Sequence, residues 1–343
     1  MAAKVGINGF GRIGRNFYRA CLQKSPGFEI VAVNDLAAPD ILAHMLKYDS
    51  TLGVLDHDVE HSADAISVGG KSVRVLSERD PSALPWKDMS VDVVMESTGL
   101  FTDREGASQH LAAGAEKVVI SAPATDPDIT LVLGVNDGDY DPSSHHVLSN
   151  ASCTTNCVAP LAKVLHDSFG IEHGFMTTIH AYTQDQGLQD MPHKDLRRAR
   201  AAAINLIPTS TGAAKAIGLV LPELKGKVDG ISVRAPVATG SLTDLVVQLR
   251  DEPTRDAVNE AYRGAAGGTL GEYLQFADDP IVSTDIVHSP YSCIFDSELT
   301  MANGRLVKVF GWYDNEWGYS CRLVDLIAMV GATLPAETAT ATA

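Results

Sequence analysis

A cysteine at the start of a predicted helix is the residue of this sequence best suited to covalent chemistry. Cys153 lies in the segment Asn150-Ala-Ser-Cys-Thr-Thr-Asn-Cys157, and a helix is predicted over 154–168. Asn150 or Ser152 can cap this helix. A thiol in a helix's first turn feels the positive end of the macrodipole, which favours the thiolate. We therefore predict that Cys153 is a nucleophile.

A thiol nucleophile needs a base, and His180 is the candidate. It ends the hydrophobic segment Met176-Thr-Thr-Ile-His180, where a side chain can emerge from a strand into a cleft. An imidazole beside a thiol can take its proton and later pass one to a substrate oxygen. A histidine at a strand end can equally be structural, and the spacing leaves the distance to Cys153 open. Cys157, one helical turn after Cys153, is expected to be structural.

A glycine-rich turn near the N-terminus has the pattern of a nucleotide site. A predicted strand (4–8) runs into Gly9-Phe-Gly11-Arg-Ile-Gly14, which opens a predicted helix (12–24). The first glycine permits a tight turn, the second lets backbone approach a pyrophosphate, and the third lets helix and strand pack closely. The amides of the helix N-terminus then meet the phosphate charge. A turn without any ligand is the alternative for this motif taken alone.

Two later strand ends favour a dinucleotide. The segment Glu29-Ile-Val-Ala-Val-Asn-Asp35 is a predicted strand ending in a carboxylate that can accept hydrogen bonds from a ribose diol. The same carboxylate would repel a 2′-phosphate, so Asp35 favours NAD over NADP. Another strand ends in Glu96-Ser-Thr98-Gly99, whose small residues leave room for a flat dinucleotide.

Arginines after residue 190 form candidate anion sites. Asp195-Leu-Arg-Arg-Ala-Arg200 supplies three arginines, and Arg234 ends another predicted strand. Their planar guanidinium groups suit phosphate. Thr211-Gly212 begins a predicted helix whose amides form a second anion cradle. For the first cluster, a solvated face or a subunit contact is the alternative.

Composition excludes several other classes of protein. The 343 residues carry a net charge of −16, which disfavours general nucleic-acid or acidic-membrane binding. No apolar run approaches the ~20 residues of a membrane span. The first residues lead straight into a strand with no room for a signal peptide, so a cytoplasmic location is expected. The five scattered cysteines match neither a disulfide framework nor a metal site.

The predicted elements indicate two domains, with α/β as the fold class. Strand–helix alternation before residue 150 is typical of βαβ units and a largely parallel sheet, a Rossmann-type dinucleotide-binding domain. Longer strands follow, as expected of an α+β catalytic domain with a mixed or antiparallel sheet. We place the first domain at 1–151 and the second at 152–317. A C-terminal helix at about 318–335 is expected to pack back on the first, and 335–343 to form a frayed terminus. The remaining predicted strands are 29–34, 65–68, 72–76, 91–96, 117–120, 146–149, 171–179, 228–236, 242–249 and 306–312, and the remaining helices are 38–47, 80–85, 104–113, 211–220, 254–266 and 318–332.

The sequence resembles the glyceraldehyde-3-phosphate dehydrogenase family along nearly its whole length. The resemblance runs from Ile7-Asn-Gly-Phe-Gly-Arg-Ile-Gly14 to Trp312-Tyr-Asp-Asn-Glu-Trp-Gly-Tyr319. Ser152-Cys-Thr-Thr-Asn-Cys157 is similar to the family's catalytic segment, a highly specific motif. The other matching segments are Lys47-Tyr-Asp-Ser50, Ile120-Ser-Ala-Pro-Ala124, Thr209-Ser-Thr-Gly-Ala-Ala-Lys-Ala216 and Leu221-Pro-Glu-Leu-Lys-Gly226.

The resemblance implies roles for particular residues. It makes Cys153 the nucleophile and His180 its partner. The segment 182–205 resembles a loop that reaches a neighbouring subunit's cofactor, and its Met191-Pro192 pair would crowd a 2′-phosphate. The positions similar to dinucleotide contacts are Arg12, Ile13, Asp35, Arg79, Thr98, Ser121 and Asn315. Those similar to substrate-phosphate contacts are Thr183, Arg198 and Arg234, and those similar to the site of attacking phosphate are Ser152, Thr154, Thr211 and Gly212.

The implied reaction is the NAD-dependent oxidative phosphorylation of glyceraldehyde 3-phosphate in glycolysis or gluconeogenesis, by a homotetramer, through a hemithioacetal and a thioester on Cys153. Erythrose 4-phosphate as substrate stays open, and a non-catalytic NAD-binding scaffold is disfavoured because both Cys153 and His180 are present. The segment Ala235-Pro-Val-Ala238, Gln184 and Cys293 depart from the family's usual residues. We expect these departures to reshape the lip of the pocket, as in a specialised paralogue that tolerates an electrophilic inhibitor.

Overall fold

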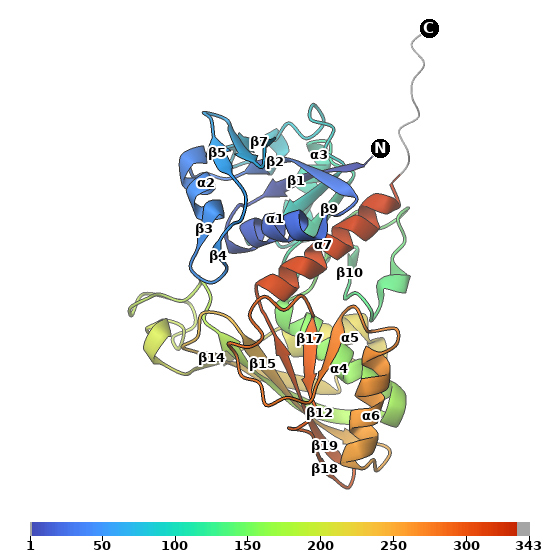
Figure 1. Ribbon diagram of the computed structural model, residues 1–343. Coiled ribbons are helices and arrows are strands. Elements are labelled where there is room, and N and C mark those ends of the chain that lie inside the picture. Colours follow the sequence, from blue (N-terminus) through green and yellow to red (C-terminus); the bar gives the residue numbers. More distant parts are fainter. Residues whose placement is uncertain (1, 335–343) are drawn as a thin grey trace. The chain divides into compact units, whose positions relative to one another are not determined.

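The computed structural model describes residues 2–334, and the chain divides into two compact units (Figure 1). Of the described residues, the first unit holds 2–130, 140–150 and 322–334. The second unit holds residues 131–139 and 151–321. The predicted frayed terminus, 335–343, and the end of the helix predicted at about 318–335 lie outside the described residues.

The first unit is built on a nine-stranded sheet in the order β10-β11-β9-β8-β1-β2-β7-β6-β5. Pairing is parallel from β10 to β7 and antiparallel for β6 and β5, so the predicted, largely parallel sheet is confirmed. The strands are β1 (Ala3–Asn8), β2 (Phe28–Asn34), β5 (Val59–His61), β6 (Ala65–Val68), β7 (Lys71–Leu76), β8 (Val93–Glu96), β9 (Lys117–Ile120), β10 (Ile129–Thr130) and β11 (Val147–Ser149).

Helices of the first unit follow its strands along the chain. They are α1 (Arg12–Lys24), α2 (Pro39–Lys47) and α3 (Arg104–Ala112), and a small hairpin of β3 (Tyr48–Asp49) and β4 (Gly53–Val54) follows α2. The helix predicted at 80–85 is wrong, because this segment forms only a 3₁₀ turn over Pro81–Ala83. Leu84 is held extended, at ψ 137°, because Pro85 follows it and the residue before a proline is pushed out of the helical region.

The second unit is built on an eight-stranded sheet in the order β13-β14-β12-β15-β19-β17-β16, with β18 on β19. The pairs β12–β14 and β16–β17 are parallel and the others antiparallel, which confirms the mixed sheet. Its strands are β12 (Ile171–Ala181), β13 (Ile207–Ser210), β14 (Val228–Ala235), β15 (Ser241–Leu249), β16 (Leu274–Ala277), β17 (Cys293–Asp296), β18 (Met301–Asn303) and β19 (Leu306–Tyr313).

Three helices lie against this second sheet and enclose its core. They are α4 (Cys153–Phe169), α5 (Ala213–Val220) and α6 (Arg255–Ala266). Leu161 of α4 and Ile217 of α5 are fully buried in one cluster with Leu245 of β15 and Val309 of β19. A last helix, α7 (Trp317–Ala332), begins in the second unit and continues in the first. No helix of the described residues has the length and apolar character that crossing a membrane would require.

Candidate active site

The local fold fixes Cys153 at the first position of α4. Ser152 is the N-cap, and its Oγ accepts a hydrogen bond of 3.0 Å from the Thr155 amide. Ala151 has a positive φ of 54°, a conformation that non-glycine residues seldom adopt. The Tyr319 hydroxyl donates to its carbonyl at 2.9 Å and so supports this turn. The half-buried Cys153 thiol is thus placed by a cap on one side and an anchored turn on the other.

His180 reaches that thiol from β12. Its Nε2 lies 3.3 Å from Cys153 Sγ, and its Nδ1 lies 2.6 Å from the Ala181 carbonyl oxygen. Nδ1 faces two partners of opposite kind, because the Ala181 carbonyl only accepts and Arg234 Nη1, 2.9 Å away, only donates. The tautomer that donates from Nδ1 to the carbonyl leaves the Nε2 lone pair facing the sulfur. The arrangement suits His180 to take the thiol proton, and the structure brings together the two residues predicted to react.

Charge and burial around the pair act in opposite directions on the thiol. Burial raises the pKa of Cys153 to about 11, and the Arg234 charge opposes this rise. Burial, followed by the Arg234 charge, lowers the pKa of His180 to about 3. The pKa of Cys153 is thus shifted upward, whereas the helix macrodipole predicted a downward shift. The effect of burying the sulfur is larger than that of the favourable charges. Burial thus favours the neutral form of both groups, and transfer of the proton from Cys153 to His180 accompanies the attack of the sulfur.

Arg234 ends β14 directly opposite His180 in the parallel β12–β14 register. Its Nη1 lies 2.9 Å from His180 Nδ1 and 3.2 Å from the Ala181 carbonyl, to which it donates. Its Nε is buried and has no hydrogen-bond partner among the described residues. A buried guanidinium nitrogen with an unused donor is suited to an anionic ligand.

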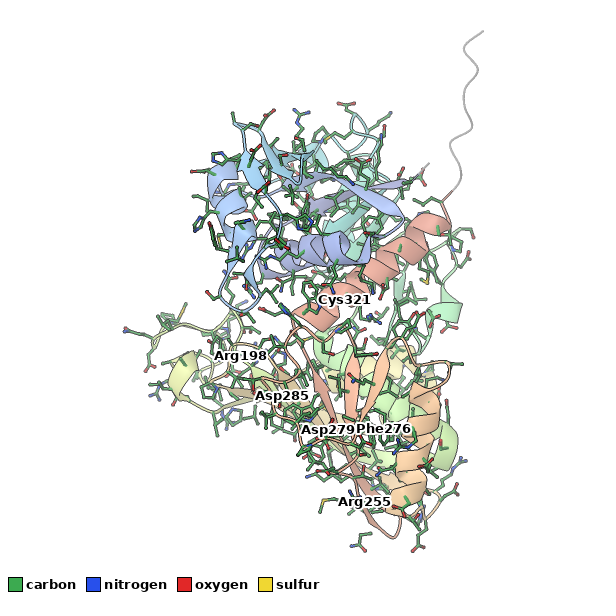
Figure 2. All side chains as sticks on the ribbon, in the orientation of Figure 1. Arg198, Arg255, Phe276, Asp279, Asp285 and Cys321 are labelled. Atoms are coloured by element: carbon green, nitrogen blue, oxygen red, sulfur yellow. The ribbon has the colours of Figure 1, made fainter. Side chains whose placement is uncertain are left out.

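The loop between β12 and β13 supplies a second arginine, Arg198 (labelled in Figure 2). Its Nε donates to Thr209 Oγ1 at 2.9 Å, its Nη2 to the Ser210 carbonyl at 3.2 Å, and its Nη1 to Asp185 at 2.8 Å. Thr183 Oγ1 also donates to Asp185. Two of the predicted substrate-phosphate residues, Thr183 and Arg198, therefore meet at one carboxylate.

The predicted attacking-phosphate residues lie at two helix N-termini. Ser152 and Thr154 belong to the start of α4, and Gly212 is the N-cap of α5, where no side chain caps the helix. The Ala213 amide donates to Thr211 Oγ1 at 3.2 Å. Helix N-termini of this kind suit anions.

Tyr313 is a site residue that our sequence interpretation missed. Its buried hydroxyl forms hydrogen bonds of 2.8 Å with Thr154 Oγ1 and 2.7 Å with Thr178 Oγ1, and its ring packs edge-on to that of His180. It thus joins α4, β12 and β19 beneath the reactive pair. It lies within the Trp312–Tyr319 segment that carried the family resemblance, so that motif was the available signal.

The residues that differ from those usual in the family lie in different environments. Cys293 is fully buried in the core of the second unit, so the expectation that it reshapes a pocket lip is wrong for this residue. Gln184 is exposed next to Thr183. The Val237 carbonyl accepts a hydrogen bond from the Tyr182 amide and so joins the segment after Arg234 to the loop after β12.

In the first unit, the glycines of the turn have the environments expected of a nucleotide loop. A Cβ on Gly9, which has φ +93°, would meet the Thr98 amide nitrogen at 2.6 Å, and one on Gly14 would meet the Gly9 carbonyl oxygen at 2.2 Å. A Cβ on Gly11 would meet nothing within 4 Å. Gly11 is also the N-cap of α1, with no capping side chain and no acidic residue in the first turn. The turn thus holds open space next to a helix N-terminus, as a pyrophosphate requires.

Asp35 and Thr98 flank this turn. The Asp35 carboxylate accepts the Phe10 amide at 2.8 Å and the Ala37 amide at 3.0 Å. Thr98 Oγ1 and its amide both donate to Glu96, a buried carboxylate that our sequence interpretation did not single out. Glu96 also accepts from Asn8 at 2.6 Å and lies 3.0 Å from His110 Nε2.

The remaining predicted cofactor residues are less closely gathered. Arg12 pairs with Asp49, Arg79 is exposed on the loop after β7, and the Ser121 amide donates to the Glu96 carbonyl at 2.9 Å. Ile13 follows in the first turn of α1 and Gly99 is exposed after Thr98. Asn315 lies in the second unit, where it accepts from Ser241 Oγ at 2.9 Å.

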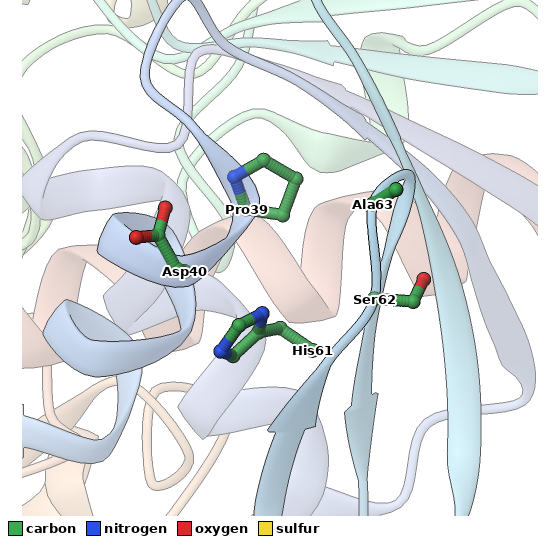
Figure 3. Close-up of a pocket in the computed structure, with 5 residues that line it drawn as sticks. All are labelled: Pro39, Asp40, His61, Ser62 and Ala63. Carbon is green, nitrogen blue, oxygen red and sulfur yellow. The ribbon is translucent and has the colours of Figure 1, made fainter.

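A separate pocket lies in the first unit between α2 and the turn after β5. Pro39, Asp40, His61, Ser62 and Ala63 line it (Figure 3). None of these residues was predicted to belong to a site. Within residues 2–334, no group of three or more His, Cys, Asp or Glu side chains is arranged to hold a metal ion.

Comparisons with known proteins agree with this geometry. Residues 3–104 match a family model described as "Glyceraldehyde 3-phosphate dehydrogenase, NAD binding domain", and residues 152–315 match "Glyceraldehyde 3-phosphate dehydrogenase, C-terminal domain". The chain is 62% identical to glyceraldehyde-3-phosphate dehydrogenase 2 of Streptomyces avermitilis, 61% to glyceraldehyde-3-phosphate dehydrogenase of Streptomyces coelicolor and 61% to that of Mycobacterium avium. Each match covers 97% of this chain and 100% of the relative.

Proposed function

The chain belongs to the glyceraldehyde-3-phosphate dehydrogenase family, and we propose that it converts glyceraldehyde 3-phosphate and inorganic phosphate to 1,3-bisphosphoglycerate, with NAD as hydride acceptor. The observation that carries this proposal is the 3.3 Å contact between Cys153 Sγ and His180 Nε2, with Nδ1 held by the Ala181 carbonyl. A thiol with a base oriented in this way is equipped for covalent catalysis.

The residues of the first unit fit the cofactor. The space at Gly11, the uncapped start of α1 and the Asp35 carboxylate are suited to a pyrophosphate and a ribose diol. When bound, NAD supplies the acceptor for the hydride. The further residues that the family resemblance assigns to its binding are Arg12, Ile13, Arg79, Thr98, Ser121 and Asn315. We add Gly99, because it follows Thr98 at a strand end whose small residues leave room for the dinucleotide.

The second unit performs the covalent chemistry. Cys153 Sγ adds to the aldehyde carbon while its proton passes to His180 Nε2, and a hemithioacetal forms. The Cys153 amide, at the N-terminus of α4, and His180 hold the developing oxyanion, and each such donor commonly contributes ~10²–10³ in rate. His180 Nε2 returns its proton to this oxygen to give the hydroxyl, and it accepts the same proton again as the carbon is oxidised, which adds ~10²–10⁴ in rate. The resulting thioester is attacked by phosphate, which releases the acyl phosphate and restores the thiol.

Two anion subsites serve this sequence of steps. The phosphate of the aldehyde is held by Arg234, Arg198 and Thr183. The buried Nε of Arg234, which has no hydrogen-bond partner among the described residues, supports this assignment. Ser152, Thr154, Thr211 and Gly212 hold the attacking phosphate near the starts of α4 and α5.

Replacement of Cys153 by serine tests the proposed chemistry. We expect Cys153→Ser to form no NADH from glyceraldehyde 3-phosphate, NAD and phosphate, while its NAD affinity, measured by fluorescence titration, stays near that of the wild type. His180→Asn should retain slow turnover and a less reactive thiol, because the proton acceptor at Nε2 is lost. Near-normal NADH formation by either variant would show that the roles are misassigned.

We also propose that residues 1–151 and 152–317 are the cofactor and catalytic domains and that the protein acts in the cytoplasm as a homotetramer. An apolar sheet face supports self-association. Phe175 of β12 is 70% exposed and Ile231 of β14 49% exposed. Thr177 pairs with Ile231, so Phe175 and Ile231 lie on one face of the sheet. Exposed apolar faces of this kind commonly form subunit contacts. A solution mass equal to one chain would contradict the assembly.

A further inference from the structure

Asp185 holds the two groups that the proposed phosphate subsite needs. Its carboxylate accepts a hydrogen bond from Thr183 Oγ1 and forms an ion pair of 2.8 Å with Arg198 Nη1. Burial raises the pKa of Asp185. The hydrogen bond from Thr183 and the charges of Arg234 and Arg198 together lower this pKa by more than burial raises it, so the net shift is downward. A negative charge of the chain itself is therefore already present between Thr183 and Arg198.

The placement of Arg198 does not depend on this carboxylate. Its Nε donates to Thr209 Oγ1 at 2.9 Å, and its Nη2 donates to the Ser210 carbonyl at 3.2 Å. These two contacts come from β13, a strand fixed in register against β14. Arg198 would thus keep two anchors if Asp185 turned away.

Asp185 lies at the surface of the second unit. Its side chain is 38% exposed, and it lies in the loop after β12 rather than in a strand or helix. A partly exposed carboxylate that turns into water gives up its contacts with Thr183 and Arg198 and regains hydration, and the two groups that it leaves are then ready to bind another anion. A phosphate ester carries up to two charges and three acceptor oxygens, so it can replace the carboxylate at both groups.

We propose that Asp185 is an internal competitor for the phosphate subsite, a specificity-determining residue that occupies Thr183 and Arg198 until a phosphate ester displaces it. This inference rests on the proposed function for the identity of the substrate. Binding then includes the release of Asp185 to solvent, so the affinity for a phosphate ester is weaker than the arginines alone would give. An unphosphorylated aldehyde has no group that displaces the carboxylate.

The test compares Asp185→Asn with the wild type. Asparagine keeps the size and an acceptor oxygen but removes the charge. Asp190→Asn is the matched control, because Asp190 lies in the same loop and pairs with Arg200 at 2.8 Å without contact to Thr183 or Arg198. The probe is glycerol 3-phosphate, a phosphate ester with no aldehyde, titrated by calorimetry into NAD-saturated protein.

We expect Asp185→Asn to bind glycerol 3-phosphate about fivefold more tightly than the wild type. In water-like surroundings, two like charges about 4 Å apart repel each other by about 1 kcal/mol, and the variant removes this repulsion between residue 185 and the ester. Asp190→Asn should bind like the wild type. The ratio of kcat/KM for glyceraldehyde 3-phosphate to that for glyceraldehyde should rise by a similar factor, and the gain should shrink at high ionic strength.

Weaker or unchanged binding by Asp185→Asn would overturn the proposal, since it would make Asp185 a support for Arg198 or an inert neighbour. An equal gain in Asp190→Asn would also overturn it, because the effect would then be a general one of loop charge. The calorimetric result does not require turnover. A wild type that binds the ester but forms no NADH would therefore refute the proposed function and leave this inference to be judged separately.

Discussion

Replacement of Arg234 by leucine tests whether its charge activates the Cys153 thiol. Arg234 Nη1 lies 2.9 Å from His180 Nδ1, and His180 Nε2 lies 3.3 Å from Cys153 Sγ. With the imidazole ring between these contacts, the positive charge and the sulfur are on the order of 8 Å apart, and at an effective dielectric constant of about 20 they interact by roughly 2 kcal/mol.

The charge of Arg234 lowers the pKa of Cys153, so removal of Arg234 raises that pKa. The thiolate population at a fixed pH then falls by about 30-fold. A thiolate of higher pKa is intrinsically more nucleophilic, which offsets about half of this effect on a logarithmic scale and leaves alkylation about fivefold slower.

Iodoacetamide is the suitable reagent because it is neutral and does not itself bind an arginine. The sign of the pH dependence follows from the raised pKa. Burial raises the wild-type pKa to about 11, so between pH 7 and pH 9 both proteins react through a minor thiolate form and the ratio of their rates is constant. At a pH above both pKa values the order of the rates reverses, because both thiols are then fully ionised and the thiolate of the variant is the more nucleophilic one.

Arg200→Leu provides the control, because it removes one positive charge from an exposed residue that pairs with Asp190. Mass spectrometry of the alkylated peptide confirms that Cys153 is the residue modified, since the other four cysteines are buried. Equal alkylation rates in the wild type and Arg234→Leu would refute the argument that this charge acts on the sulfur. An equal slowing in Arg200→Leu would refute it as well.

Two further substitutions test the packing around the sites. Gly14→Ala should lower the free energy of unfolding by about 1–3 kcal/mol, because its Cβ would meet the Gly9 carbonyl oxygen at 2.2 Å. Gly11→Ala, whose Cβ meets nothing within 4 Å, should unfold in urea like the wild type yet bind NAD more weakly, and equal stability of both variants would contradict this reasoning. Tyr313→Phe should cost about 1–3 kcal/mol in urea unfolding, because the hydroxyls of Thr154 and Thr178 lose a buried partner. Tyr48→Phe, at a residue that is 53% exposed, is its control, and a similar loss there would show that the hydrogen bonds of Tyr313 are not the cause.

The long elements were predictable from the sequence because their patterns are local. The helix predicted at 12–24 matches α1, and the strands predicted at 171–179 and 242–249 match β12 and β15 within a few residues. The short strands β16 and β17 were missed. Each has only four residues, and β17 is buried at every position, so it shows no alternation of apolar and polar residues to detect.

The identity of the reactive residues was also predictable, but the direction of the electrostatics was not. The motif around Cys153 implied a helix N-terminus, which Ser152 does cap. Desolvation of the sulfur depends on which distant segments cover it, and no local pattern reports that. Tyr313 was overlooked for the same reason, since its partner Thr154 lies 159 residues away along the chain. Asp185 was overlooked although Arg198 is only 13 residues away, because the segment between them has no regular pattern that indicates how it folds back.

The register of two parallel strands explains why the site forms at all. His180 pairs with Arg234 across β12 and β14, although 54 residues separate them in the sequence. Side chains alternate along a strand, so His180 shares a face with the buried Thr178 and Met176, while the exposed Phe175 lies on the opposite face. A shift of one residue in this register would turn Arg234 away from His180. The hydrophobic alternation that buries one face of β12 therefore also aims the imidazole at the thiol, so the packing of the core and the geometry of the proton transfer depend on the same pairing.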